Sequence, residues 1–376
     1  MLKILSTTVF RFFLLILAVL LPAHVSAQDN LIIVGQAIDL SGPNAAVGRD
    51  YVAGITTFFD SINSHGGIHG KRVRYLVRDD QGNPANSAKL AAELIERDKA
   101  DFLIGGIGAS TVDAVVATPA FQQSKISLFA PLSGVQKQYG GRVVYWRPSA
   151  EQEMQYIFSY FDKLGIRQVG IALQENSVNH DMYQYVVSEI QRRKMTLSGV
   201  VKITGNPDEL NRESAKLAAG NPNIVITVAD TVATGLFLKS FRRSAPKVFV
   251  AGLSLTNLDT VAELAGRGSL EWTVFSQVVP NPLGKKSVVQ IDHSNMMKKF
   301  RDEELSSLTF EGFLVAKTLS RAMQNGRSGR DMFAGVTAQR NQIDLGGFLM
   351  TPDEQQNRIS GFVDIALFRK GGGLLF

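Results

Sequence analysis

The sequence predicts an α/β protein made of two doubly wound lobes, each built on a parallel sheet. Short runs rich in β-branched residues alternate with amphipathic helical segments along most of the chain. This alternation starts near residue 31 and starts again near residue 151. With the first 27 of the 376 residues set aside as a leader, the remaining 349 are too many for one ordinary core and about right for two.

The leader, residues 1–27, has the pattern of a secretory signal peptide. Lys3 and Arg11 precede an apolar run over 12–21, and the segment ends in Val25-Ser26-Ala27. A basic start, a short apolar core and small residues at the cut site are typical of such peptides. The run is too short to cross a hydrocarbon core of about 30 Å as a helix, and an uncleaved anchor is the alternative. We therefore expect export to the periplasm with cleavage after Ala27.

The composition excludes several classes of protein. The chain has no Cys, which excludes disulfides, thiolate nucleophiles and cysteine metal sites. With 45% hydrophobic and 20% charged residues, it is neither disordered nor a membrane bundle. The basic runs lie on predicted amphipathic helices with acidic residues close by, which favours solvated helix faces and argues against nucleic acid as a partner.

In the first series, the helices have clear start and stop signals. Tyr51, Ile55 and Phe58 recur at helical spacing, and Gly66-Gly67 ends that helix. Asn83 followed by Pro84 supplies a cap and a favourable first residue for the second helix. The predicted strands are 31–38, 73–77, 102–104 and 126–130, and the third helix is 110–123.

The second series repeats the pattern, and its regular alternation implies right-handed crossovers and parallel sheets. Its predicted strands are 169–173, 199–203, 223–228, 248–252 and 272–278, and its helices are 151–164, 181–194, 208–219, 231–243 and 258–265. The tail differs. Helices are expected over 288–304, 310–325 and 329–338, a short strand over 348–350, and a closing strand over 361–369. We expect these helices to pack on the first lobe and the last strand to return to the second.

The most distinctive loop is Gly105-Gly106-Ile107-Gly108-Ala109-Ser110-Thr111, between a strand and a helix. Small residues let a ligand approach the backbone, and unpaired N–H groups at a helix start attract an anion. A dinucleotide loop would need a third Gly and a later acid, which are missing here. We therefore favour a carboxylate site over a plain tight turn. A second loop, Ala130 to Gly134, would place Ser133 beside Ser110, although an ordinary turn explains it equally well.

Residues for catalysis or metal binding are not gathered in the sequence. The His residues beyond the leader have no metal-ligand spacing, and no Gly-x-Ser-x-Gly motif occurs. Asp79 and Asp80 are adjacent on a strand, so their side chains face opposite sides. We predict no catalytic residues, no metal and no cofactor.

Several blocks resemble the type I periplasmic binding proteins, above all the leucine/isoleucine/valine-binding branch that serves ABC importers. Residues 34–43 followed by Gly48-Arg49-Asp50 resemble the opening of that family. Residues 62–71 resemble its "IN-x-x-GGI-x-G" block, and 78–84 resemble its "DD…DP" turn. The stretches 277–282 and 361–364 match later blocks. Blocks in the right order over the whole mature chain are far more specific than any one of them.

The resemblance implies two lobes joined by a hinge of three crossing segments, which close on a small ligand. It places lobe 1 at 28–147 plus about 280–350, and lobe 2 at 148–279 plus about 351–376. In such proteins the first lobe holds the ligand's carboxylate with backbone N–H groups and hydroxyls. The matching positions are Ala109, Ser110, Thr111, Leu132, Ser133 and Gly134. The second lobe would contribute Asn176, Val178, Asp230 and Ser254.

One departure from the family pattern bears on the ligand. Where amino-acid binders place an acid for the ammonium group, this chain has Ser254. Asp230 either supplies that charge or serves only as a helix cap before Thr231. If neither residue meets an ammonium group, an amino acid would leave a buried cation unpaired, at a cost of several kcal/mol. A carboxylate, an amide or an aromatic acid would then be the better ligand.

The sequence thus indicates a binding protein, not an enzyme. Its expected ligand is a small polar molecule that bears a carboxylate, such as an amino acid or a related organic acid or amide. We expect a monomer that presents this ligand to an ABC permease in the inner membrane. The alternatives are a sensory receptor of the same fold and an exported enzyme.

Overall fold

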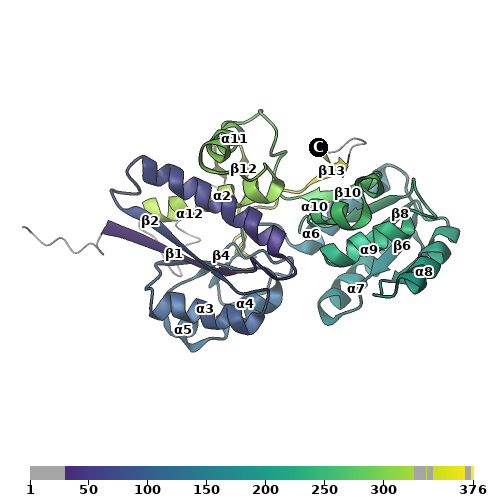
Figure 1. The fold of residues 1–376 in the computed structure, drawn as a ribbon, viewed down its shortest axis with the longest axis horizontal. Coiled ribbons are helices and arrows are strands. Elements are labelled where there is room, and N and C mark those ends of the chain that lie inside the picture. Colours follow the sequence, from purple (N-terminus) through teal and green to yellow (C-terminus); the bar gives the residue numbers. More distant parts are fainter. Residues whose placement is uncertain (1–29, 326–335, 337–341, 369–373) are drawn as a thin grey trace, which may run out of the picture.

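The computed structural model describes residues 30–325, 336, 342–368 and 374–376. The expected signal peptide lies outside these ranges, as does all of the expected helix 329–338 except Val336. Figure 1 shows two lobes, each with helices on both faces of a central sheet. The predicted two-lobed α/β architecture is confirmed.

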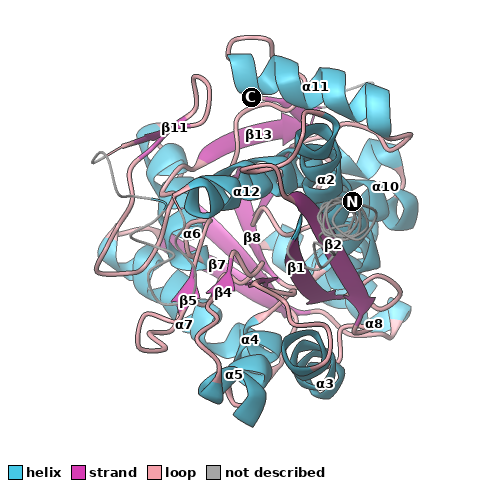
Figure 2. Cartoon of the chain, turned by 90° about the vertical axis from the view of Figure 1, so that its left-hand side faces the viewer, coloured by secondary structure: helices cyan, strands magenta, loops and turns pink. Residues whose placement is uncertain are grey.

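The first lobe contains a parallel five-stranded sheet in the order β2-β1-β3-β4-β5. Its strands are β1 (Leu31–Ile38), β2 (Arg72–Asp79), β3 (Phe102–Ile104), β4 (Leu128–Phe129) and β5 (Val143–Val144). One face carries α3 (Pro84–Glu96), α4 (Ala109–Val116) and α5 (Pro119–Gln123), and the other carries α2 (Ala45–Ser64) and α12 (Ser307–Gln324). Figure 2 shows these two helical layers on either side of the strands.

The prediction of one helix over 110–123 was wrong, because the segment forms two helices, α4 and α5. Pro119 cannot donate the backbone hydrogen bond that would continue α4, and it occupies the first position of α5 instead. The hydroxyl of Thr118 accepts a hydrogen bond from the backbone N–H of Phe121 at 3.2 Å and so caps the new helix. The cap predicted at Asn83 is present, since its side chain accepts from the N–H of Ala85 at 2.9 Å.

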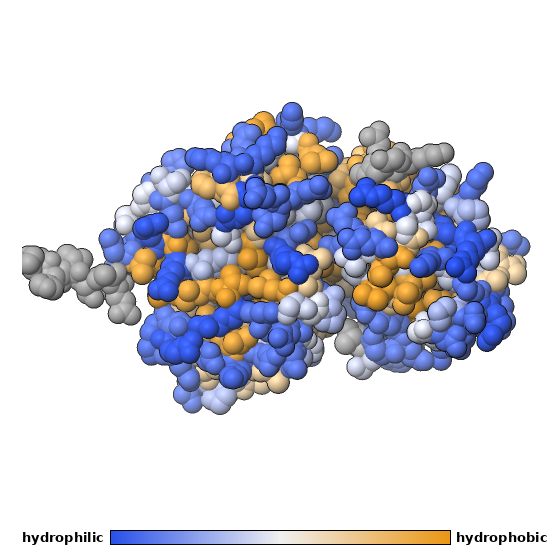
Figure 3. All heavy atoms as spheres, in the orientation of Figure 1, coloured by the Kyte–Doolittle hydropathy of each residue, from blue (hydrophilic) through white to orange (hydrophobic). Residues whose placement is uncertain are grey.

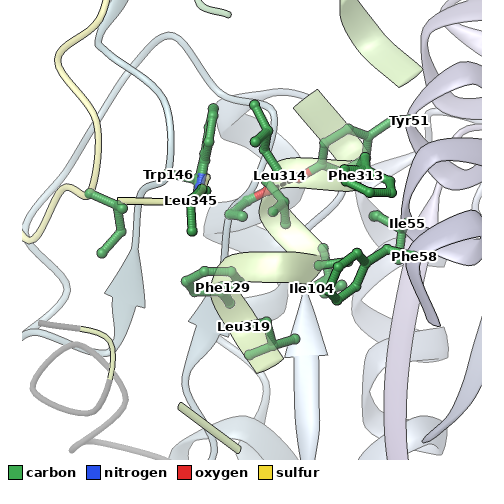
Figure 4. Packing of buried hydrophobic residues seen from close by; sticks show 14 of the residues in the cluster. Tyr51, Ile55, Phe58, Ile104, Phe129, Trp146, Phe313, Leu314, Leu319 and Leu345 are labelled. Carbon is green, nitrogen blue, oxygen red and sulfur yellow. Dashed lines mark hydrogen bonds between the residues drawn. The ribbon is translucent and has the colours of Figure 1, made fainter. Parts of the chain in front are cut away.

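Helices α2 and α12 cross with their backbones in close approach. A Cβ atom at Gly54 would lie 1.9 Å from the carbonyl oxygen of Thr309, and one at Gly312 would lie 2.1 Å from that of Tyr51. Only glycine allows this approach, so the tail helix α12 returns to the first lobe at a specific place. Between the same two helices, Phe58 and Phe313 meet edge to face with ring centroids 5.1 Å apart (Figure 4).

The second lobe contains a seven-stranded sheet in the order β14-β13-β10-β9-β8-β6-β7. Its strands are β6 (Gln168–Leu173), β7 (Thr196–Lys202), β8 (Ile224–Val228), β9 (Phe249–Gly252), β10 (Thr273–Gln277), β13 (Asp364–Phe368) and β14 (Leu374–Leu375). The predicted parallel pairing is confirmed for β6 to β10, and the two tail strands add to this sheet in the opposite direction. β13 runs antiparallel to β10, and β14 runs antiparallel to β13. The chain reaches β13 from the other lobe and not through a crossover helix, so the right-handed crossover rule does not apply to it.

Helices cover both faces of this sheet as well. One face carries α6 (Ala150–Lys163) and α7 (Ser177–Arg192), and the other carries α8 (Pro207–Ala219), α9 (Thr231–Phe241), α10 (Leu258–Ala265) and the 3₁₀ helix η2 (Arg267–Leu270). Helix α11 (Val288–Phe300) and the hairpin of β11 (Ile343–Asp344) and β12 (Leu349–Met350) belong to the tail.

The chain passes between the lobes after β5, after β10 and before β13. The first and third of these crossing segments run side by side. The N–H of Tyr145 donates to the carbonyl of Asn357 at 3.0 Å, and the N–H of Ile359 donates to the carbonyl of Tyr145 at 2.8 Å. The exact lobe limits expected near residues 147, 280 and 350 stay a prediction.

Candidate ligand-binding site

The sequence-predicted site residues lie in loops that follow parallel strands, or in the first turn of the helix that comes after such a loop. In the first lobe these loops follow β3 and β4, and in the second lobe they follow β6, β8 and β9. Ligands of open α/β sheets bind outside the carboxyl ends of the strands, so these loops are where a ligand is expected. In Figure 3 the surface is indented between the two lobes.

The two first-lobe loops lie against each other, as expected from the sequence. The N–H of Gly108 donates to the carbonyl of Leu132, and the N–H of Leu132 donates to the carbonyl of Gly106, both at 3.0 Å. Gly108 is the N-cap of α4 and has a φ of 94°, a conformation that favours glycine. Because Gly108 has no side chain to accept from the first N–H groups of α4, those donors are left for an anion.

The three hydroxyls predicted for this lobe differ in what they contact. Thr111 is buried, and its hydroxyl donates to the carbonyls of Ile107 at 3.0 Å and Gly108 at 2.8 Å. Ser133 is also buried and donates to the carbonyl of Val135 at 2.7 Å. Ser110 is exposed. A carboxylate accepts hydrogen bonds and does not donate them, so it needs a hydroxyl whose hydrogen is not already used. Thr111 and Ser133 donate to backbone carbonyls, whereas Ser110 faces solvent and can donate to a ligand.

In the second lobe, two predicted residues cap helices. Asn176 is the N-cap of α7 and accepts from the N–H of Asn179 at 2.8 Å. This cap explains why α7 begins at Ser177, four residues before the helix start predicted from sequence. Val178 lies in its first turn.

Asp230 is the N-cap of α9. It accepts from the N–H of Ala233 at 2.8 Å and from the side-chain amide of Gln174 at 2.7 Å. Of the two roles considered for Asp230, the cap is therefore formed, and the bond to Gln174 joins the loops after β6 and β8.

Ser254 belongs to a buried group of polar and charged side chains that was not predicted from the sequence. We call it the Arg147 cluster, and its members are Arg147, Glu153, Ser254, Ser276 and Glu311. Glu153 Oε2 accepts from the N–H of Ser254 at 3.0 Å and from the hydroxyl of Ser276 at 2.6 Å. The guanidinium of Arg147 donates to the hydroxyl of Ser254, and its Nη2 atom lies 3.5 Å from Glu153 Oε1. The other terminal nitrogen, Nη1, lies 3.8 Å from Glu311 Oε2.

The charged side chains of the cluster are almost completely removed from solvent. Those of Arg147, Glu153 and Glu311 are 1%, 2% and 3% exposed. Burial raises the pKa of Glu311 to about 7, the positive charge of Arg147 opposes this rise, and the negative charge of Glu153 adds to it. One signal could have revealed the cluster from sequence, because Glu153 and Ile157 share the apolar face of α6.

A cavity of about 270 Å³ lies between the lobes. It is lined by residues of both lobes, including Asp50 of α2, Ser254 and Asp259 of the second lobe, and Ser306 at the start of α12. Asp50 Oδ2 accepts from the hydroxyl of Ser306 at 2.8 Å. Burial raises the pKa of Asp50, the bond from Ser306 opposes this, and the charge of Asp259 adds to it. Of the ten sequence-predicted site residues, Ser254 is the one that lines this cavity.

Across residues 30–325 and the described parts of the tail, no group of three or more His or acidic side chains is placed to hold a metal ion. Within the same residues, no helix combines the length and the apolar character that a membrane crossing requires. Asp79 and Asp80 serve different loops, since Asp79 accepts from the N–H of Leu40 and Asp80 accepts from that of Gly82, both at 2.9 Å.

Two sheet-centred lobes, three crossing segments and ligand-type loops on both lobes define a two-lobed binding protein. A family model described as "Periplasmic binding protein" matches residues 32–355, and the chain belongs to this family. The resemblance seen in the sequence is therefore confirmed. The protein is a binding protein that is similar to the Leu/Ile/Val-binding proteins, and it is not an enzyme.

Similar proteins support this assignment. Over 302 residues, the chain is 22% identical to a Leu/Ile/Val-binding protein homolog of Brucella melitensis, a match that covers 77% of each chain. A substrate-binding periplasmic protein from Ralstonia solanacearum has the same fold, with a TM-score of 0.81, 21% identity, and coverage of 92% of this chain and 99% of that one. The branched-chain amino acid transporter substrate binding protein of Streptococcus pneumoniae, solved in complex with isoleucine, has a TM-score of 0.77 at 15% identity, with coverage of 92% and 97%.

Proposed function

We propose that this protein captures a small ligand bearing a carboxylate in the periplasm and presents it to an ABC permease in the inner membrane. The observation that carries the proposal is the start of α4. There a side-chain-free cap at Gly108, unpaired N–H groups and the exposed Ser110 hydroxyl converge at the ends of two neighbouring strands. The signal peptide would direct the chain to that compartment and be cleaved after Ala27. We expect the mature protein to act there as a monomer.

In the proposed complex, the first lobe holds the carboxylate with the N–H groups of Ala109, Ser110 and Thr111. The neighbouring loop of Leu132, Ser133 and Gly134 forms the adjacent wall. Carboxylates bound at helix starts gain both hydrogen bonds and the favourable end of the helix dipole. This arrangement fits any ligand with an accessible carboxylate, and so covers amino acids and organic acids alike.

The second lobe closes over the ligand with the loops of Asn176, Val178, Asp230 and Ser254. The hydroxyl of Ser254 accepts from Arg147 and its N–H donates to Glu153, and a serine carries no negative charge, so Ser254 does not supply an acid for a ligand ammonium group. Asp230 uses one oxygen to cap α9 and the other to bind Gln174, and a carboxylate oxygen can accept more than one hydrogen bond. Asp230 is therefore our candidate partner for a cationic group on the ligand.

The test uses the mature protein, residues 28–376, and a panel of amino acids, organic acids and amides. A ligand that binds the folded state raises the melting temperature, by an amount that grows with the ratio of ligand concentration to Kd. We expect one chemical class that contains a carboxylate to raise it, and its methyl ester to have no effect. If the ester binds as tightly as the acid, or no member of the panel binds, the proposed carboxylate site is wrong.

A further inference from the structure

The Arg147 cluster joins the two lobes at a crossing segment. Arg147 lies on the segment between β5 and α6. Glu153 on α6, Ser254 after β9 and Ser276 on β10 all belong to elements of the second lobe. Glu311 lies on α12, which packs on the sheet of the first lobe. One guanidinium therefore contacts charged side chains from both lobes.

The hydrogen bonding within the cluster is unequal between the two lobes. On the second-lobe side, Glu153 accepts from Ser254, Ser276 and Arg147. On the first-lobe side, Glu311 lies 3.8 Å from Nη1 of Arg147, which is an ion pair but too long for a hydrogen bond. Within the described part of the chain, Nη1 and Nε of Arg147 have no hydrogen-bond partner.

A buried guanidinium with unpartnered N–H groups is costly, because the donors have lost water without gaining an acceptor. Glu311 is the nearby acceptor on the other lobe. A small displacement of α12 relative to the first crossing segment would bring its carboxylate within hydrogen-bond range of Nη1. Such a displacement is the kind of movement that a hinge between lobes produces.

We propose that Arg147 and Glu153 are positioning residues for ligand binding. Glu153 fixes the backbone of the cleft loop at Ser254. Arg147 ties that loop to Glu311 of the other lobe, in a hydrogen bond that forms when the lobes change their arrangement. The inference rests on the proposed function for its consequence in ligand affinity, but the link between Arg147, Glu311 and the lobe arrangement stands apart from any ligand.

The proposal predicts a dependence on pH, since the charge of Glu311 changes near neutrality. Its pKa is raised to about 7 by burial. The groups that face it are Arg147, Glu153 on α6 and Tyr51 on α2, and Tyr51 is un-ionised because burial raises its pKa well above the usual value. The ring of His293 on α11 packs on Phe310 and Phe313, which are near neighbours of Glu311 along α12. An ionised Glu311 attracts Arg147 more strongly than a neutral one, so high pH favours the arrangement with the completed hydrogen bond.

The experiment measures the lobe arrangement without ligand. Because the chain has no Cys, two introduced cysteines, Lys89→Cys on α3 and Arg212→Cys on α8, can carry spin labels at exposed positions, one on each lobe. We expect the distribution of distances between the labels to shift between about pH 6 and about pH 8. In Glu311→Gln, the distribution should stay at its low-pH form throughout. The matched control is Glu189→Gln on α7, a buried carboxylate paired with Arg192 and Arg193, which should keep the wild-type response.

Ligand affinity supplies the second measurement, with whichever compound the panel identifies. Glu153→Gln and Glu311→Gln should each weaken binding about tenfold or more, since each removes a charged hydrogen bond that the bound arrangement uses. If both variants bind like the wild type after correction for their stability, the cluster is only structural. If the label distances do not change with pH and Glu311→Gln matches the wild type, the link between the lobes is refuted, even where the panel succeeds.

Discussion

The burial of His293 predicts how the protein responds to acid. The ring of His293 is fully buried in α11, and neither ring nitrogen has a hydrogen-bond partner in the described part of the chain. It packs on the rings of Phe310 and Phe313, with centroids 4.8 and 5.4 Å away. Burial lowers the pKa of His293 from 6.5 to about 4, because the imidazolium would lose its hydration and find no acceptor.

The size and sign of the effect follow from this shift. A group whose pKa is lower in the folded state binds fewer protons there, so acid favours the unfolded chain. The contribution of neutral His293 to the free energy of unfolding is fully present above about pH 6.5, and it is lost as the pH falls toward about 4. A shift of about 2.5 pKa units corresponds to about 3 kcal/mol, an order-of-magnitude figure for a fully buried group.

The perturbation is His293→Leu, which keeps an apolar side chain of similar size against the two rings. Urea unfolding of the mature protein at pH values from about 7 to about 4.5 gives the free energy of unfolding at each pH. We expect the variant to gain stability relative to the wild type as the pH falls, by about 2 kcal/mol or more at the acid end. His180→Leu, at an exposed position on α7, is the control and should follow the wild type. A difference between His293→Leu and the wild type that does not change with pH would refute the reasoning.

Four further variants test the core and the candidate site. Glu311→Gln should gain stability relative to the wild type as the pH rises from about 4.5 through about 7, by about 3 kcal/mol in urea unfolding, because the raised pKa of Glu311 makes its ionisation costly in the folded state. Ser110→Ala should leave the melting temperature unchanged but weaken ligand binding by about 1–3 kcal/mol, as calorimetry would measure. Asp230→Asn keeps one side-chain oxygen for the cap of α9 but loses the bond accepted from Gln174, so a lost affinity without a lost stability would report a cationic group on the ligand. Gly312→Ala should lower the free energy of unfolding by about 1–3 kcal/mol or more, since its Cβ would lie 2.1 Å from the carbonyl oxygen of Tyr51.

The elements that could be predicted from sequence are those specified by near neighbours. The cap at Asn83 and Pro84, the helical spacing of Tyr51 and Ile55, and the small-residue loop before α4 each occupy a few consecutive positions. The break between α4 and α5 was missed although Thr118-Pro119 marks it, because the apolar pattern on both sides continues through it. The pairing of the loops after β3 and β4 followed from strand order alone.

The Arg147 cluster could not be predicted in the same way. Arg147 and Ser254 are 107 residues apart, and Glu311 belongs to a helix that returns from the end of the chain. Each residue taken alone has an ordinary explanation, such as a charge near a turn or on a helix. Only the packing of α12 and α6 around the first crossing segment shows that these charges share one buried site.

The sequence by itself determined the two α/β series, most helix starts and the family to which the chain belongs, because periodicity, caps and motif order are written in short stretches. The tertiary structure alone decided that the last strands run antiparallel, that Thr111 and Ser133 turn their hydroxyls to the backbone, and that a buried cation connects both lobes. These features depend on which distant surfaces meet when the core is packed. Hydrogen-bond partners and desolvation are properties of that packing and not of local sequence.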